Sequence, residues 1–386
     1  MKTEEIIEVK KKSIQKWPKV AIIILNWNGW KDTIECLESV FRIDYPNYQV
    51  IVVDNGSSDD SVEKIKAWAD GKQEVLTPEP LHPLYHLSHP TVNKPIPYIY
   101  YTREEAERGG NFKLEEKLKK EWQERRKPNS KKFYPTSPYP LILIQTGENL
   151  GFAGGNNVGV RYGLKNDKYD YFLLLNNDTV VEPNSLNGLV KTAKTNRNIG
   201  VVGGKIQYYN EPNKIWYAGG KLDLIRGSGY HKNYNGIDKD LNGRIKISFV
   251  TGCLMLINKK ALSIDELLLE EYFLYVEDVD FCYSSFKKGL EAFVNLDSVI
   301  YHKISSTINH NKGISPDAVY YLTRNRLYFM LRRQKNKIKK IEFLLFFGIT
   351  RLFRVLEWLL EMKKEYIIAT FKGIKDGYGG KLGRRR

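Results

Sequence analysis

Short apolar runs that end in polar tips recur along the chain, and they predict the buried strands of a parallel sheet. Residues 20–25, 50–53 and 173–175 contain only Ala, Val, Ile and Leu. A strand that is covered on both faces of a parallel sheet has this continuous apolar character. The first two runs are each followed by a plausible amphipathic helix, so they predict a β-α-β unit of an α/β fold.

The polar tips after these runs are the first candidate site. They read Asn-Trp-Asn-Gly at 26–29, Asp-Asn-Gly-Ser-Ser-Asp at 54–59 and Asn-Asn-Asp at 176–178. Open α/β sheets bind ligands at the carboxyl ends of their strands, where a carboxylate such as Asp54 commonly meets a ribose or a base. Asp178 is a hard oxygen ligand that suits Mg²⁺ or Mn²⁺ held against a phosphate.

Asp178 also has a purely structural interpretation. Taken alone, the segment 176–178 fits equally well an Asx-rich turn that caps the helix expected after Pro183 and Asn184. Because two other strands also end in polar tips, a binding site is favoured over a simple turn at 176–178.

A glycine-rich segment at 149–159 follows a further apolar run at 141–144. Its glycines let the backbone approach a ligand closely at the start of a helix. The spacing fits neither the dinucleotide-binding pattern nor the P-loop, so both of those classes are disfavoured.

Together these segments resemble the successive motifs of family 2 glycosyltransferases, in particular the rhamnosyltransferase-like branch. They occur in the order and at the spacing of that family, and similar segments continue further along the chain. The resemblance covers roughly residues 19 to 330. The segments that carry it are 26–29, 53–57, 149–159, 176–178, 250–253, 275–280, 301–302 and 324–326.

The resemblance implies a GT-A fold, which is an α/β fold with a Rossmann-like, mostly parallel sheet flanked by helices. It implies an inverting transfer of a sugar from a dTDP- or UDP-linked donor, rhamnose among the candidates, to a hydroxyl of a glycan or lipid-linked acceptor. A metal, Mg²⁺ or Mn²⁺, would bridge the diphosphate. The matching residues are Asn26, Asn28, Asp54, Asn149, Gly155, Asn176, Asn177 and Arg324 for the donor nucleotide, Asp178 and His302 for the metal, and Thr251, Gly252 and Asp280 for the acceptor.

Two of these assignments depart from a simple match. Asp178 matches the last residue of the family's D-x-D motif, but Asn176 replaces the first aspartate, so Asn176 is left with hydrogen bonds to the ribose or the sugar. His302 follows the apolar run 298–301. A lone histidine there is more often a structural hydrogen-bonding residue, whereas the resemblance implies that it completes the metal site.

The acidic segment Glu277-Asp278-Val279-Asp280 is the candidate for catalysis. Displacement at an anomeric carbon needs a group that removes the proton of the acceptor hydroxyl, and a carboxylate can do this. At the start of the helix expected over 281–287, the helix dipole would keep Asp278 ionised. An isolated segment of this kind more often only caps a helix, and the choice between Glu277 and Asp278 as the base stays open.

The charge is concentrated at the C-terminus. Residues 324–386 hold 18 Lys and Arg against 5 Asp and Glu, which is +13 of the formal net charge of +16. Within them, 343–360 is apolar apart from two arginines and a glutamate. Each arginine would cost roughly 2.5–3.5 kcal/mol inside a bilayer, so an amphipathic helix on an anionic membrane surface is favoured over a spanning one. Five aromatic residues support the membrane-surface helix, namely Phe343, Phe346, Phe347, Phe353 and Trp358.

That tail has two other interpretations. It could form a helix packed on the protein's own core with a solvated basic face, or it could bind nucleic acid. No recognisable nucleic-acid module accompanies it, so no nucleic-acid partner is expected.

The domain organisation follows from composition. A charged segment at 1–18 without an apolar stretch precedes a glycosyltransferase domain at 19–330, and a basic helical tail occupies 331–386. Residues 73–140 carry ten of the fifteen prolines and form an insertion, either a surface excursion on the sheet edge or a lid.

Three cysteines without a C-x-x-C pair favour a reducing compartment, so we expect a cytoplasmic enzyme at the inner face of the cell membrane.

Two further functions are weighed against this one. A sugar-nucleotide nucleotidyltransferase should carry a glycine-rich basic loop after the first strand, and 26–31 is not one. A non-catalytic, glycan-binding GT-A protein is disfavoured because Asp54, Asp178, Glu277 and Asp278 are all present.

Overall fold

The computed structural model describes residues 17–125, 135–262, 267–304, 308–309 and 313–385. The expected N-terminal segment 1–18 lies outside these ranges except for its last two residues. In the described part of the chain, no helix has both the length and the apolar character that a membrane crossing requires.

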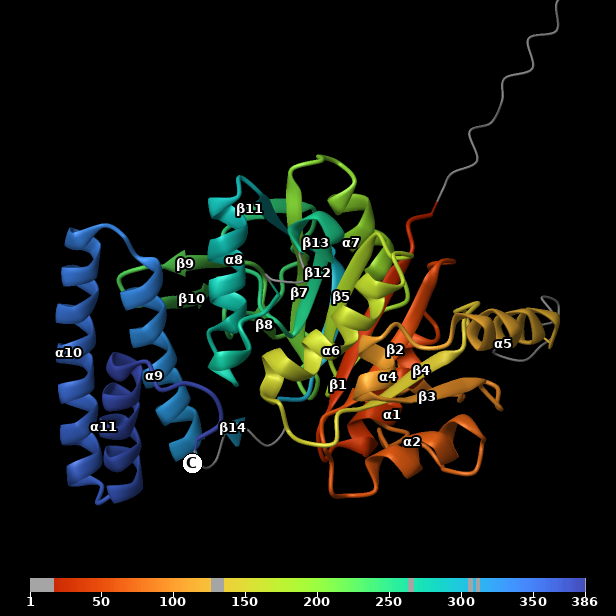
Figure 1. Cartoon of the computed structure of the whole chain (residues 1–386), viewed down its shortest axis with the longest axis horizontal. Helices are drawn as coiled ribbons and strands as arrows, with labels where there is room; N and C mark the ends of the chain where they lie inside the picture. Colours follow the sequence, from red (N-terminus) through yellow and green to blue (C-terminus); the bar gives the residue numbers. More distant parts are fainter. Residues whose placement is uncertain (1–16, 126–134, 263–266, 305–307, 310–312, 386) are drawn as a thin grey trace, which may run out of the picture.

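One large mixed sheet forms the centre of the molecule (Figure 1). Its strand order is β11-β13-β7-β12-β5-β1-β2-β4-β3, with β6 paired to β13 and β8 paired to β7. The five strands from β5 to β3 run parallel, whereas β12 is antiparallel to both of its neighbours. The strands are β1 (Val20–Asn26), β2 (Tyr48–Asp54), β3 (Tyr98–Thr102), β4 (Leu141–Gln145), β5 (Tyr171–Asn176), β6 (Thr179–Val181), β7 (Ile199–Tyr208), β8 (Ile215–Tyr217), β11 (Arg244–Ile247), β12 (Leu254–Asn258) and β13 (Glu291–His302).

Helices and short hairpins surround this sheet. The helices before the C-terminal region are α1 (Trp30–Val40), α2 (Ser61–Ala69), α3 (Tyr85–Ser88), α4 (Arg103–Glu107), α5 (Phe112–Arg125), α6 (Gly151–Lys165), α7 (Ser185–Ala193) and α8 (Glu277–Lys287), with 3-10 turns at Lys259–Ala261 and Glu270–Tyr272. The hairpin strands are β9 (Gly220–Asp223), β10 (Ser228–His231), β14 (Ile308–Asn309) and β15 (Gly313–Ile314).

The core lies between the sheet and helices such as α6. All seven residues of β2 are buried, because α6 packs against β1 and β2 on one side. In α6 the side of the helix that meets the sheet carries Gly155 and Gly159. A Cβ atom at Gly159 would lie 2.9 Å from Ile23 and 3.2 Å from Val53. The glycines therefore let the helix backbone come closer to the strands than any larger residue would allow.

The insertion at 73–140 extends the sheet. Its strand β3 pairs in parallel with β4 and forms one edge. The polypeptide before β3 is tied to α1 through the buried Glu38 carboxylate. This carboxylate accepts a hydrogen bond from the Val92 backbone N–H (2.7 Å) and forms an ion pair with Lys94. In the described ranges, Trp122 of α5 also donates to the carbonyl of Ser137 (3.2 Å). These contacts tie the segment before β3 to α1, and α5 to the segment before β4.

The C-terminal region consists of α9 (Pro316–Arg333), α10 (Lys337–Leu360) and α11 (Lys364–Gly379), at the left of Figure 1. Helices α9 and α11 pack closely, since a Cβ at Gly373 would lie 2.9 Å from the Tyr320 carbonyl oxygen and one at Gly377 2.7 Å from that of Arg324. Helix α9 runs through position 330, so the backbone does not break where the charge distribution changes.

Candidate active site

The ends of β1, β2 and β5 meet at one edge of the sheet. Asn26 is paired in register with Asp54, and Leu25 with Asn176. The Asn26 side chain donates to Asp54 Oδ1 (2.8 Å) and accepts from the Thr33 hydroxyl (2.7 Å). Thr33 in turn accepts from the Asn177 amide at 3.0 Å. A continuous hydrogen-bond network therefore joins the three strand tips.

Asp54 and Asn28 have different exposures at this edge. Asp54 is fully buried, and its Oδ2 accepts from the Ser57 backbone N–H (3.2 Å). Both carboxylate oxygens of Asp54 are thus engaged within the protein, where they hold the loop that follows β2. Asn28 is exposed, and its Oδ1 accepts from the Ser58 backbone N–H (2.7 Å), which ties the loop after β1 to the loop after β2.

Asn55 connects the tip of β2 to the glycine-rich segment, and the sequence interpretation missed it. Its buried amide donates to Asn149 Oδ1 and to the Gly151 carbonyl, both at 3.1 Å, and accepts from the Leu150 backbone N–H at 3.0 Å. Asn149 also accepts from the Gly151 N–H (2.9 Å). A side-chain amide can donate and accept hydrogen bonds at once. An Asn directly after the strand-end Asp54 could therefore have indicated a residue that connects two loops.

Gly155 does not face open space. A Cβ atom at this position would clash with Leu25 Cδ1 and lie 3.1 Å from Asn55 Cγ. The close approach that Gly155 permits is therefore between α6 and the sheet, and its expected role at the donor stays a prediction.

Asp178 and His302 lie together, as the resemblance implied. His302 is the last residue of β13, and its Nε2 is 3.1 Å from Asp178 Oδ1, with both side chains largely buried. Burial by itself would lower the pKa of His302, but the nearby Asp178 carboxylate and Cys253 thiol raise that pKa well above its usual range.

These two side chains fit a divalent metal. A carboxylate suits Mg²⁺ and Mn²⁺, and a neutral imidazole is a common metal ligand in proteins. Metals of this class often take only one or two protein ligands and fill the other positions with phosphate oxygens and water. Among the residues that the structure describes, no group of three or more His, Cys, Asp and Glu side chains is gathered for a metal.

Glu277 and Asp278 begin helix α8. Asp278 accepts hydrogen bonds from the backbone N–H groups of Gly252 (3.0 Å) and Val279 (2.8 Å). Burial raises the pKa of Asp278 to about 6, although these hydrogen bonds act to lower it. Glu277 is buried with its Oε2 unpaired, and burial followed by the charge of Asp278 raises the pKa of Glu277 well above its usual range. Near neutral pH, Asp278 is therefore the ionised member of the pair.

The backbone before α8 is held in an unusual conformation. Phe273, Tyr275 and Val276 all have positive φ angles, of 64°, 68° and 76°. A β-branched residue such as Val276 rarely adopts this conformation, and such strain clusters at functional sites. Asn325 stabilises this turn, because its amide donates to the carbonyls of Leu274 and Tyr275, both at 2.8 Å.

The segment Thr251-Gly252-Cys253 connects the metal pair to Asp278. The Gly252 N–H binds Asp278, the Cys253 carbonyl accepts from the Asn176 N–H (3.1 Å), and the Cys253 thiol lies near enough to His302 to raise the pKa of that imidazole. The Thr251 side chain is nearly buried. Gly252 also packs against α6, since a Cβ there would lie 2.9 Å from the Phe152 ring. Three consecutive residues therefore connect the expected metal ligands to the expected base.

Asp280 and Arg324, expected at the acceptor and the donor, make their contacts within the protein. Asp280 is only 2% exposed, and it accepts from Arg333 Nε (2.7 Å) and from the Tyr272 hydroxyl (3.0 Å). Arg324 is fully buried and donates to the carbonyls of Tyr272 (2.7 Å) and Gly383 (2.6 Å). Protein groups therefore occupy both side chains: Asp280 pairs with α9, and Arg324 holds backbone segments together. Their expected contacts with the acceptor and the donor stay predictions.

The geometry agrees with a comparison to known families. Residues 21–79 and 127–264 match the family described as "Glycosyl transferase family 2", which is about half of the chain. The chain belongs to this family. It is a glycosyltransferase, and the α/β, GT-A fold with a helical C-terminal region that the sequence predicted is confirmed.

Individual relatives are distant. The chain is 23% identical over 244 residues to the low-salt glycan biosynthesis hexosyltransferase Agl10 of Haloferax volcanii, a match that covers 63% of this chain and 78% of that protein. A solved structure with a similar fold is the mannosyltransferase PcManGT from Pyrobaculum calidifontis in complex with GDP-Man and Mn²⁺. Its TM-score is 0.50 at 12% identity, and the match covers 95% of this chain and 76% of that one.

Proposed function

We propose that this glycosyltransferase moves a sugar from a nucleoside-diphosphate donor to a hydroxyl of a glycan or lipid-linked acceptor, with inversion and with a divalent metal. The observation that supports the proposal most directly is the segment 251–253, which joins Asp278 to the Asp178–His302 pair. Rhamnose on dTDP and a hexose on UDP are the donors favoured by resemblance. The similar mannosyltransferase was solved with GDP-Man, so GDP-linked hexoses join the candidates.

Asp278 acts as the general base in this proposal. The acceptor hydroxyl gives its proton to the Asp278 carboxylate while its oxygen forms a bond to the anomeric carbon. The bond from that carbon to the diphosphate oxygen breaks, and the nucleoside diphosphate leaves with the electron pair. A pKa of about 6 suits this role, because such a carboxylate is ionised at neutral pH and still basic enough to accept a proton.

Glu277 has a different role. Its raised pKa keeps the carboxyl group neutral near pH 7, so it is a poor proton acceptor beside an ionised Asp278. We assign Glu277 to positioning the first turn of α8.

Asp178 and His302 would hold Mn²⁺ or Mg²⁺, which when bound neutralises the charge that develops on the leaving diphosphate. Asn26, Asp54 and Asn55 hold the loops that border the nucleotide. Asn28, Asn176 and Asn177 lie at the tips of these strands, where Asn28 is exposed and Asn176 is partly exposed. We assign the direct contacts with the nucleoside and the sugar to this second group.

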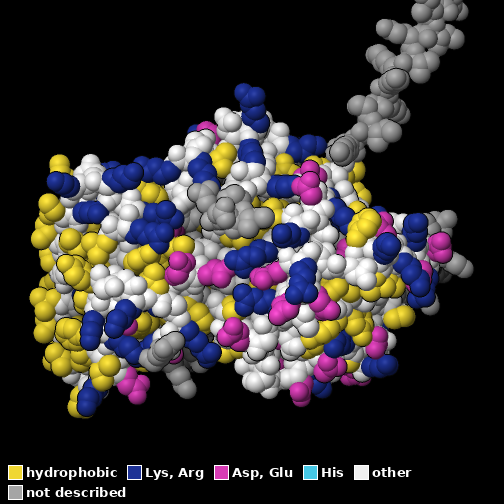
Figure 2. Space-filling model, viewed as in Figure 1, with side chains coloured by type: hydrophobic (Ala, Val, Ile, Leu, Met, Phe, Trp, Pro, Cys, Tyr) yellow, Lys and Arg dark blue, Asp and Glu magenta, His cyan; other side chains and the backbone are white. Residues whose placement is uncertain are grey.

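Helix α10 supports a membrane-bound location for this reaction. Ten of its apolar side chains are 42–88% exposed, at spacings of three and four that place them on one side of the helix. They are Ile338, Ile341, Leu344, Leu345, Ile349, Leu352, Phe353, Leu356, Leu359 and Leu360. Figure 2 shows the resulting apolar surface at the left of the molecule, over the helix labelled α10 in Figure 1, with Lys and Arg side chains at its upper and lower margins.

An apolar face of this size on a water-exposed helix marks an interaction site. Apolar side chains bordered by cations fit the interface of an anionic membrane, with the helix lying in the plane of the surface. Three of the aromatic residues expected to face lipid, Phe343, Phe347 and Trp358, are instead buried. The exposed aliphatic residues therefore carry the proposed membrane contact.

A binding screen tests the donor proposal. dTDP-, UDP- and GDP-sugars are titrated calorimetrically into the full chain with and without Mn²⁺, with Asp178→Ala as the control. We expect one nucleotide class to bind, and to bind more tightly with Mn²⁺ in the wild-type chain only. Equal affinities with and without Mn²⁺ would exclude metal-dependent donor binding.

The membrane proposal has its own test. Deleting residues from 331 onward is unsuitable, because α11 packs on α9 and Arg324 binds the Gly383 carbonyl. The full chain with Leu345→Ser, Leu352→Ser and Leu360→Ser is instead sedimented with anionic vesicles. The control chain carries Ser at three exposed isoleucines outside α10, namely Ile225, Ile237 and Ile245.

We expect the α10 variant to lose about tenfold or more in vesicle binding, since each buried leucine contributes about 1.5–3 kcal/mol, and the control to bind as wild type does. If the α10 variant binds vesicles normally but changes its oligomeric state, the apolar face is an interface between copies of this chain and the membrane proposal is wrong.

A further inference from the structure

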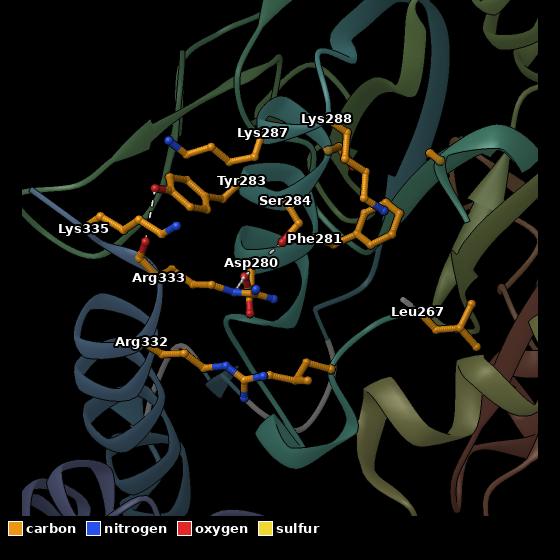
Figure 3. Close-up of a pocket in the computed structure, with 13 residues that line it drawn as sticks. Leu267, Asp280, Phe281, Tyr283, Ser284, Lys287, Lys288, Arg332, Arg333 and Lys335 are labelled. Atoms are coloured by element: carbon orange, nitrogen blue, oxygen red, sulfur yellow. Dashed lines mark hydrogen bonds and ion pairs between the residues drawn. The ribbon is translucent and has the colours of Figure 1, made fainter. Parts of the chain in front are cut away.

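A cavity lies apart from the residues assigned to the active site. It has a volume of about 570 Å³ and is bounded by α8, the end of α9 and residues 267–269 (Figure 3). None of the residues assigned above to the donor, the metal or the base lines it. Asp280 does line it, because a residue two positions after Asp278 projects from a different side of the helix.

Five cationic side chains line this cavity. Lys287 and Lys288 come from the last residues of α8 and the position after it, Arg332 and Arg333 from the last turn of α9, and Lys335 from the loop that follows. Among the described residues that line the cavity, Asp280 is the one carboxylate, and it already binds Arg333 and the Tyr272 hydroxyl. Apart from Arg333 and Lys288, the described lining residues include three more cations, Lys287, Arg332 and Lys335, and the Glu271 carboxylate lies near Arg332. This described lining favours an anion.

Helix dipoles account for part of this arrangement. Cations are favourable near the C-terminal end of a helix, and four of the five lie at the ends of α8 or α9. This effect explains each pair separately, but it does not require two helix ends to meet at the same hollow. Figure 3 shows Arg332 and Arg333 extending from α9 toward α8, with the Arg333 guanidinium on Asp280. Like charges brought together in this way repel one another, and a bound anion would relieve that repulsion.

The remaining lining is partly apolar. Leu267, Leu269 and Phe281 line the cavity beside the polar Ser284 and Tyr283. The volume falls within the range of about 300–1,000 Å³ that is typical of ligand sites, which is larger than a single phosphate needs. The cavity can therefore hold an anionic group together with an attached less polar part.

The cavity lies next to the start of α10. Lys335 precedes that helix by two residues, and Lys340 of the first turn donates to the Leu331 carbonyl (2.9 Å). Ile338 and Ile341, the first members of the exposed apolar face, are 68% and 57% exposed. A group bound in the cavity would thus lie close to the surface that we propose contacts lipid.

We propose that this cavity binds a phosphate or diphosphate group. Arginine and lysine are the usual partners of phosphate, with arginine adding directed pairs of N–H donors. Two sources share this chemistry, namely a soluble phosphate compound and a phosphate carried on a lipid at the membrane surface. The lipid source rests on the proposed membrane contact of α10, whereas the phosphate site itself does not.

The test uses the full chain with Asp178→Ala, in EDTA, so that a diphosphate cannot bind through metal at the active site. The pocket variant adds Lys288→Gln, Arg332→Gln and Lys335→Gln, and leaves Arg333 in place because it pairs with Asp280. The control adds Lys113→Gln, Lys117→Gln and Lys120→Gln, three exposed lysines on α5. Both variants lose three positive charges, so general attraction to anions is matched.

Each chain is titrated with inorganic pyrophosphate and sedimented with phosphatidate-containing vesicles. We expect the pocket variant to bind about tenfold or more weakly than the control in at least one assay. A loss with pyrophosphate supports a site open to soluble phosphates, and a loss with vesicles alone supports a lipid phosphate. If the pocket variant and the control behave alike in both assays, the proposal is wrong, whatever the outcome of the donor screen.

Discussion

Replacing Asp278 by asparagine tests the mechanism most directly. The substitution keeps the shape of the side chain and removes the carboxylate that accepts the proton. In a single displacement the base acts on the acceptor, so the donor should bind with near wild-type affinity while turnover falls. Loss of a general base typically lowers the rate by about 10² to 10⁴.

The pH dependence of the transfer rate gives a second expected magnitude for the role of Asp278. Since the pKa of Asp278 is about 6, about nine-tenths of the carboxylates are ionised at pH 7 and about one-tenth at pH 5. The base works only when it is deprotonated, so transfer should rise with pH and be about tenfold faster at pH 7 than at pH 5. Asp278→Asn should lose this rise, because its side chain does not titrate.

Stability must be measured beside activity. Asp278 accepts two backbone N–H groups, from Gly252 and Val279, and an asparagine oxygen can satisfy only one of them in the same geometry. The other is left unpaired, at a cost of about 1–3 kcal/mol. Thermal unfolding therefore decides whether a slow variant is still folded at the assay temperature.

Glu277→Gln is the matched control. Glu277 is expected to be neutral already, so a neutral isostere should retain most of the transfer activity. Donor affinity is measured by calorimetry and transfer by release of the nucleoside diphosphate. Wild-type transfer by Asp278→Asn would refute the assignment, and an inactive Glu277→Gln with normal donor binding would move the base to Glu277.

Three further predictions concern residues whose roles the structure assigned or changed. Asp178→Ala should abolish the Mn²⁺-dependent part of donor binding and His302→Ala should weaken it less, as measured by calorimetry, and an unchanged Mn²⁺ dependence in Asp178→Ala would remove Asp178 from the metal site. Arg324→Ala should lower the free energy of unfolding by about 3 kcal/mol or more in denaturant titrations, because it leaves a cavity where a large, fully buried side chain was packed; a fully stable variant with weakened donor binding would support the donor role. Gly155→Ala should destabilise the protein by about 1–3 kcal/mol through overpacking against Leu25, and an unchanged melting temperature would contradict that packing role.

The sequence by itself was enough to locate the edge of the sheet that carries the site. Apolar runs covered on both faces predict parallel strands, and parallel strands place their carboxyl ends at one edge. Asn26, Asp54 and Asp178 are therefore expected side by side, and the register of β1 with β2 and β5 confirms the alignment of these strand tips. Local periodicity was sufficient here because each tip is a direct continuation of its own strand.

The direction of individual side chains was decided only by the tertiary structure. Asp278 and Asp280 are two residues apart, yet one meets Gly252 and the other meets Arg333 of α9, a partner 53 residues away in sequence. Arg324 lies in a segment that resembles a donor site, but the C-terminal residues bury it. A positive φ angle is usually marked in a sequence by glycine. Phe273, Tyr275 and Val276 have positive φ angles without being glycine, so the sequence did not indicate this turn.

These features share a physical reason. The position of a strand tip depends on the burial and hydrogen bonding of its own strand. The apolar residues next to the tip in the sequence already indicate that burial. The contacts of Gly155, Asp280 and Arg324 depend on segments that are distant along the chain and close only after folding, and several alternative partners satisfy the same local sequence. Packing against α9, α11 and the sheet selects one of them.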